Sequence, residues 1–192
     1  MTIVSLLSII AKKQAENSLC HSRASGFHWM QTTGIHSGEN EMATILIVYH
    51  SQTGKTQKMA ETVAEGAKSI EGVEVVLKKA ADATLEDLLA ADGLAIGTPE
   101  NFGYMSGMIK DFFDRTYVGA QEKVFRKPFV VFISAGNDGT GALRSIERIA
   151  LGYKFKTVYS PVIAKGAITE EILNQCHELG ATIAGGCQMH IY

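Results

Sequence analysis

The stretch that most constrains the fold is Ile45–Ala67, where an unbroken apolar run leads through a short polar loop into an amphipathic helix. The run Ile45–Tyr49 is typical of a central parallel strand that is covered on both faces. From Met59 onward apolar residues recur at helical spacing, and several of them are alanine, so the helix can pack closely on a sheet. The segment therefore predicts a parallel α/β arrangement.

The loop between this strand and this helix has the composition of a phosphate site. Residues 51–56 offer hydroxyls, an amide and a flexible glycine where the free N–H groups and the positive end of the helix dipole point. Lys55 and Lys58 lie in the first helical turn, and within the segment Ile45–Ala67 no acidic residue precedes Glu61. Cations at that end oppose the helix dipole by about 0.3–1 kcal/mol each unless an anion compensates. We therefore expect the loop to bind a phosphate group.

Composition restricts the class of protein further. The chain has 192 residues, of which 46% are hydrophobic, and a formal net charge of −2, which suits one globular α/β domain. A nucleic-acid-binding protein would need a basic patch, and no apolar run approaches the roughly 18 residues that span a bilayer. Three cysteines without a C-x-x-C pair indicate a reduced, cytoplasmic setting rather than a disulfide framework.

Residues 1–42 differ in pattern from the remainder. Only Met1 precedes the short apolar run Thr2–Ile10, so the charged region that a secretory signal needs is missing. Cys20 and the three histidines that follow it match no zinc-module spacing, and we predict no metal site. We expect residues 1–42 to be a disordered leader or an over-extended start, and residues 43–192 to form the folded domain.

Beyond residue 43, short apolar runs alternate with helical patterns. Thr84–Asp87 is a capping-box pattern, and Pro161 in the last apolar run places that strand at a sheet edge. Five strands alternating with helices predict a doubly wound parallel sheet with helices on both faces. The expected strands are 45–49, 73–79, 93–97, 129–134 and 156–165, and the expected helices are 56–70, 84–91, 105–117, 140–151 and 169–184.

Three loops leave the carboxyl ends of these strands, where ligands bind in a sheet of this kind. Loop 51–56 suits a phosphate. Loop 98–104 combines two aromatic residues with a glycine that allows close backbone approach, and loop 134–139 is small and glycine-rich. A phosphate cradle, an aromatic edge and a bare backbone wall together suit a planar heterocycle with a phosphate tail, which is the shape of FMN.

The motifs SQTGKT, GTPENFGYMSGMIKDFFDR and SAGNDG resemble those of the flavodoxin-like superfamily, in its short-chain branch of NAD(P)H-dependent FMN reductases and quinone reductases. The resemblance covers about residues 43–186, and it implies a sheet of order 2-1-3-4-5 and FMN as the cofactor. It implies that the FMN phosphate is bound by Ser51, Gln52, Thr53, Gly54, Lys55 and Thr56. It implies that the ring is bordered by Thr98, Pro99, Glu100, Asn101, Phe102, Gly103 and Tyr104, and on its other side by Ser134, Ala135, Gly136, Asn137 and Gly139.

The resemblance also implies an enzyme, in which NAD(P)H reduces the bound FMN and a quinone or similar acceptor reoxidises it. The lack of aromatic residues from Ser134 to Gly141 favours this role, because an uncovered ring face admits a nicotinamide. A flavodoxin-type electron carrier, which would sandwich the ring and carry a strongly acidic surface, is one alternative. A non-catalytic flavin-binding regulator is another. We assign no acid–base catalyst, expect no nucleic-acid or membrane partner, and leave homo-oligomerisation open.

Gly54-Lys55-Thr56 also resembles the end of a nucleotide-binding P-loop. That motif needs a glycine five residues before Gly54, where this chain has Tyr49, and no predicted strand ends in an acid that could hold Mg²⁺. The sequence therefore disfavours ATP or GTP hydrolysis. Of the polar residues near the loops, we expect His50 to form an ordinary hydrogen bond or face solvent, and Asp138 to orient its own loop as an Asx-turn.

Overall fold

The computed structural model describes residues 42–192, in which strands and helices alternate as predicted. The predictions for a leader therefore lie outside the described residues, apart from the exposed Met42. The elements are β1 (Ala43–Tyr49), α2 (Lys55–Lys68), β2 (Val73–Lys79), α3 (Leu85–Ala90), β3 (Gly93–Asn101), β4 (Tyr104–Met105), α4 (Gly107–Ala120), β5 (Pro128–Ala135), α5 (Thr140–Tyr153), β6 (Lys156–Thr157), β7 (Val162–Lys165) and α6 (Glu170–Gln188).

The strands form one sheet in the order β2-β1-β3-β5-β6, and all of these pairings are parallel. The short strand β7 continues the same edge, because it pairs with the end of β5 while β6 pairs with its beginning. Counted together, β6 and β7 are the fifth strand of the predicted order. The predicted doubly wound α/β sheet is therefore confirmed.

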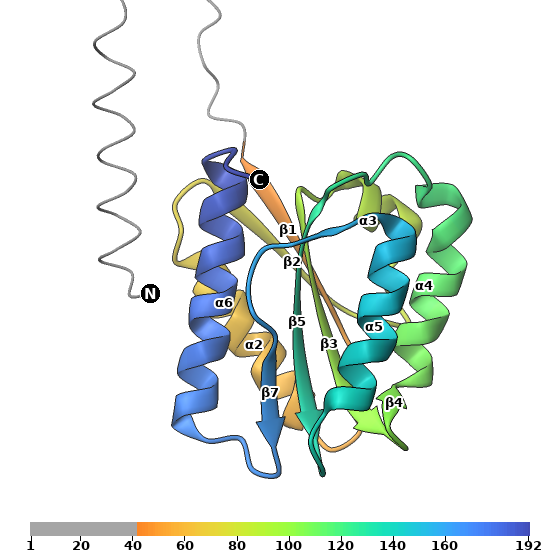
Figure 1. The fold of residues 1–192 in the computed structure, drawn as a ribbon. Helices are drawn as coiled ribbons and strands as arrows, with labels where there is room; N and C mark the ends of the chain where they lie inside the picture. The colour runs from red at the N-terminus through yellow and green to blue at the C-terminus, as the bar shows by residue number, and fades with distance from the viewer. Residues whose placement is uncertain (1–41) are drawn as a thin grey trace, which may run out of the picture. The chain divides into compact units, whose positions relative to one another are not determined.

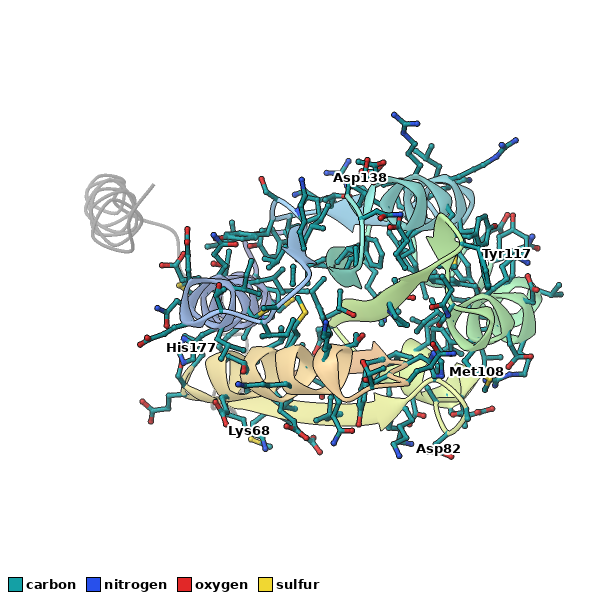
Figure 2. All side chains as sticks on the ribbon, turned by 90° about the horizontal axis from the view of Figure 1, so that it is seen from below. Lys68, Asp82, Met108, Tyr117, Asp138 and His177 are labelled. Carbon is teal, nitrogen blue, oxygen red and sulfur yellow. The ribbon has the colours of Figure 1, made fainter. Side chains whose placement is uncertain are left out.

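Helices cover both faces of the sheet (Figure 1). One core layer joins α2 and α6 to the sheet through buried residues such as Met59, Val63 and Leu179. The other joins α3, α4 and α5, and it contains Phe112 and Phe113. Seen along the strands, His177 on α6 and Tyr117 on α4 mark the two opposite layers (Figure 2). Within residues 42–192, no helix is long and apolar enough to cross a lipid bilayer.

Two predicted segments are corrected by the structure. We predicted a loop at residues 98–104, but β3 continues to Asn101 and pairs with β4 as an antiparallel hairpin. The turn residues Phe102 and Gly103 have φ angles of 52° and 72°, the positive values that tight hairpins need. Phenylalanine is an unusual turn residue, so the pattern predicted no hairpin. We also predicted one strand at 156–165, and this strand is broken before β7 because Pro161 has no N–H for the ladder.

Helices α3 and α4 each begin directly after a residue whose side chain caps the helix. The predicted capping box is present, since Thr84 and Asp87 exchange side-chain to backbone hydrogen bonds at the start of α3. Helix α4 begins later than predicted, at Gly107, because Ser106 caps it by accepting a hydrogen bond from the N–H of Ile109.

The packing of α2 against α6 depends on two glycines. A Cβ atom on Gly66 would lie 2.0 Å from the carbonyl oxygen of His177, and one on Gly180 would lie 2.0 Å from that of Val63. Neither position has room for a side chain, so the two helix backbones are in direct contact. This contact sets the position of α2, and therefore of the loop that precedes it.

We predict that Gly180→Ala lowers the free energy of unfolding by about 1–3 kcal/mol, because the added methyl group overlaps the Val63 carbonyl. Gly185→Ala in the same helix is the matched control. Its Cβ atom would meet only Met189 Cε at 3.6 Å, so alanine should leave stability unchanged or raise it by up to about 1 kcal/mol. Urea denaturation followed by circular dichroism measures both, and equal midpoints would contradict the close contact.

Candidate functional site

The carboxyl ends of β1, β3 and β5 surround an open cavity of about 170 Å³. All three predicted loops contribute to it, as expected for a doubly wound sheet. Ten of the predicted site residues line the cavity: Gln52, Thr53, Lys55, Thr56, Pro99, Glu100, Asn101, Ser134, Ala135 and Gly136.

Helix α2 begins at this cavity without a capping side chain. Gly54 occupies the N-cap position in the left-handed conformation with φ of 83°, and no side-chain cap is present. A Cβ atom built on Gly54 would meet nothing within 4 Å, and the first turn of α2 contains no acid. The N–H groups and the positive end of the α2 dipole are therefore available to an anion.

Two buried polar atoms beside this loop have no hydrogen-bond partner. They are Oγ of Ser51 and Nδ1 of His50, and no other buried side-chain N or O atom within residues 42–192 is unpaired. A buried polar group without a partner costs about 1–3 kcal/mol. Burial also lowers the pKa of His50, which favours the neutral imidazole. The unpaired hydroxyl of Ser51 and the uncapped helix together fit the phosphate group of FMN.

Side chains of the first loop connect it to β5 and to the residue that follows β7. The hydroxyls of Thr56 and Ser134 lie 2.8 Å apart in a buried hydrogen bond that joins the start of α2 to β5. Lys55 Nζ donates to the carbonyl oxygen of Gly166 at 2.6 Å, across 111 residues of sequence. Sequence reasoning missed Gly166, because its contribution is a backbone oxygen that no residue pattern marks.

The second loop divides into buried and exposed parts. Thr98 is fully buried, and its Oγ1 accepts a hydrogen bond from the N–H of Ser106 at 2.9 Å, so this residue holds the hairpin rather than lining the cavity. Phe102 lies at the turn and is fully exposed, and Tyr104 is 46% exposed. The hairpin thus presents two aromatic side chains at the surface beside the cavity.

The third loop is held by two carboxylates. Glu100 accepts hydrogen bonds from the N–H groups of Gly139 at 3.2 Å and Ala142 at 3.4 Å. Asp138 Oδ1 accepts from the N–H of Thr140 at 2.9 Å, which is the Asx-type turn that we predicted. The hydrogen bonds from Thr140 lower the pKa of Asp138. Asp138 lies exposed at the start of α5 (Figure 2).

The two helix N-termini at this edge therefore differ. Protein carboxylates already accept from the first N–H groups of α5, whereas α2 has neither a cap nor an acid in its first turn. An anionic group bound in this cavity is favoured at α2 and disfavoured at α5, where it would meet two negative charges.

Two further sets of residues lie away from the cavity. Cys176 and Cys187 are buried thiols whose pKa burial raises to about 12, so both are unreactive at neutral pH. Within residues 42–192, no three His, Cys, Asp or Glu side chains are grouped as a metal site would require.

The sheet topology defines the class of flavodoxin-like, doubly wound α/β domains, and comparisons with known proteins identify the family. A sequence profile described as flavodoxin matches residues 47–180. A flavodoxin from Aquifex aeolicus (strain VF5) is 39% identical over an alignment of 159 positions, which covers 74% of this chain and 86% of that protein. The chain belongs to the flavodoxin family.

Solved structures agree with this assignment. A flavodoxin from the domain Archaea superposes with a TM-score of 0.67 at 26% identity, covering 76% of this chain and 99% of that one. A flavodoxin, WrbA-like protein from Agrobacterium tumefaciens gives a TM-score of 0.65 at 27% identity, covering 77% of this chain and 99% of that one.

The family confirms FMN as the cofactor, because flavodoxins bind FMN. It also overturns one prediction. We predicted an NAD(P)H-dependent flavin or quinone oxidoreductase, and this is wrong, since the curated relative is a flavodoxin, an electron carrier. The flavodoxin-like superfamily is confirmed, and the reductase branch within it is not. The prediction rested on the resemblance to the reductase branch, on the lack of aromatic residues from Ser134 to Gly141 and on the small net charge.

We predict that Ser51→Ala weakens FMN binding by about 1–3 kcal/mol, because the hydroxyl lost would donate to a phosphate oxygen. The same change should leave the stability of the FMN-free protein unchanged or higher, since it removes a buried hydroxyl that has no partner. Fluorescence titration with FMN and thermal unfolding of the FMN-free protein measure the two effects. Thr62→Ala, which removes a hydroxyl bonded to the Lys58 carbonyl on α2, should leave the FMN affinity unchanged. A Ser51→Ala protein that is destabilised and binds FMN normally would contradict this role.

Proposed function

We propose that this chain is a flavodoxin-type electron carrier, which holds FMN in the cavity at the ends of β1, β3 and β5 and exchanges electrons with redox partner proteins. The observation that carries the proposal is the uncapped start of α2 beside the unpaired, buried hydroxyl of Ser51. This combination supports a phosphate group at one end of a cavity that remains open at its mouth. When bound, FMN supplies the redox chemistry, and the protein binds and orients it.

The residues of the first loop bind the phosphate in this proposal. The N–H groups at the start of α2 and the hydroxyls of Ser51 and Thr53 donate to its oxygens, and Gly54 allows close approach because it has no side chain. Thr56 and Ser134 fix the loop against β5 through their buried hydrogen bond. Lys55 adds a positive charge at the cavity while its ammonium group holds the loop after β7 through Gly166.

The ring of FMN lies in this proposal between the hairpin and loop 134–139. Pro99 and Asn101 line one side of the cavity, and Ala135 and Gly136 line the other. Phe102 and Tyr104 are exposed on the same hairpin, and in this proposal they shield the ring from water. An electron carrier needs only a ring edge that a partner can approach, so no side chain is assigned to proton transfer.

We predict that the protein with its natural sequence binds FMN. Riboflavin should bind at least about 3 kcal/mol more weakly, because it lacks the phosphate and the charged hydrogen bonds that the phosphate forms. Titration of the flavin-free protein with FMN, FAD and riboflavin, followed by absorbance and fluorescence, measures the difference. Equal affinity for FMN and riboflavin would remove the first loop from the proposal.

The carrier role has a separate test. NADPH or NADH alone should leave the bound FMN oxidised, whereas the protein reduced by dithionite should pass its electrons to cytochrome c, used here as a model protein acceptor. Stopped-flow absorbance at the flavin band follows both reactions. Repeated turnover with NADPH as the sole reductant would contradict the carrier role, and so would failure of the reduced protein to reduce cytochrome c.

A further inference from the structure

The β3–β4 hairpin is tied to the first turns of α5 by three hydrogen bonds. Glu100 Oε2 accepts from the N–H of Gly139 at 3.2 Å, and Glu100 Oε1 accepts from the N–H of Ala142 at 3.4 Å. The N–H of Met105 donates to the buried Oγ of Ser145 at 3.2 Å. These bonds join residues 39 to 42 positions apart in the sequence, so they belong to neither the hairpin nor the helix alone.

The same two elements are also in direct backbone contact. A Cβ atom on Gly141 in α5 would lie 2.0 Å from the carbonyl oxygen of Gly103 in the hairpin turn. Gly103 adjoins the exposed Phe102, and the start of α5 adjoins loop 134–139. A displacement of the hairpin relative to α5 therefore moves both walls of the cavity.

Helix α5 depends on Glu100 to accept from the N–H groups of Gly139 and Ala142, because the nearby Asp138 accepts from the N–H of Thr140. Its N-cap residue is Gly139, which has no side chain, and no side-chain cap hydrogen bond comes from that position. The Glu100 carboxylate takes this place from another element, at the positive end of the α5 dipole, where a negative charge is stabilised.

We propose that Glu100 is a positioning residue of the FMN site, whose carboxylate latches the hairpin onto the N-terminus of α5 and holds residues 98–104 and 134–139 as one unit. This proposal rests on the FMN site proposed above. It does not depend on which proteins exchange electrons with the bound FMN. Glu100 also lines the cavity. Its negative charge therefore opposes the addition of electrons to a flavin bound there and lowers the flavin midpoint potential.

The first experiment uses the flavin-free protein, and it tests the latch whether or not FMN binds. Glu100→Gln keeps the size of the side chain, but it removes the charge and one of the two accepting oxygens. Amide hydrogen exchange at Gly139 and Ala142 should become about tenfold faster in this variant, as expected for the loss of one charged hydrogen bond. Exchange in α2 should not change. Glu147→Gln, an exposed position on α5, is the control and should leave all these rates as they are.

The second experiment uses the FMN-bound protein and separates position from charge. Gly141→Ala pushes the hairpin away from α5 without changing any charge. Both Gly141→Ala and Glu100→Gln should raise the FMN dissociation rate constant by about tenfold. Glu100→Asp keeps the charge, so it should raise this rate constant less than Glu100→Gln does. Potentiometric titration should show a higher midpoint potential in Glu100→Gln and a potential close to that of the natural protein in Glu100→Asp.

The outcomes separate the latch from the proposed function. Unchanged exchange at Gly139 and Ala142 in Glu100→Gln would overturn the latch, and so would unchanged FMN dissociation in both Glu100→Gln and Gly141→Ala. If the natural protein bound no FMN, the proposed function would fail while the exchange experiment still decided the latch. If Glu100→Gln did not fold, unchanged FMN dissociation in Gly141→Ala would overturn the latch.

Discussion

Two helix N-termini face the same edge of the sheet, and the different ways in which their N–H groups are satisfied organise the whole site. At α5, the carboxylates of Glu100 and Asp138 accept from the first N–H groups. At α2, the N-cap is Gly54, no side chain caps the helix, and the first turn has no acid. Because an uncapped helix start attracts an anion, the proposed function places the phosphate end of FMN at α2 and its uncharged end toward α5.

In the flavin-free protein, the first loop contains an unpaired polar group that lowers the stability of the folded state. The buried hydroxyl of Ser51 has no partner, which costs about 1–3 kcal/mol. The surrounding structure keeps the loop in place, because Thr56 is bonded to Ser134 and the α2 backbone packs directly on α6 at Gly66 and Gly180. A ligand that satisfies Ser51 recovers this energy, and it therefore stabilises the folded domain as it binds.

The sequence predicted correctly those elements that depend on residues close together in the chain. The apolar run Ile45–Tyr49 became β1, and the capping box Thr84–Asp87 formed as expected. Ten cavity residues could be predicted because the strand ends of any doubly wound sheet converge. The hairpin was not predictable, since its turn places Phe102 at a φ of 52°, which side chains rarely adopt. The partners of Glu100 lie 39 and 42 residues further along the chain, and only tertiary packing brings them to it.

One argument for an enzyme was that this chain lacks the strongly acidic surface expected of a flavodoxin-type carrier. Surface charge governs how fast partners meet and how that rate depends on salt, and not whether a bound flavin can exchange electrons. The chain has a net charge of only −2, and it exposes apolar side chains such as Tyr104 in β4 and Met108 in α4, which are 46% and 36% exposed. Short-range apolar contact between a carrier and its partner is little screened by salt. A small net charge therefore bears on how partners approach a carrier of this kind, and it is compatible with the proposed carrier role.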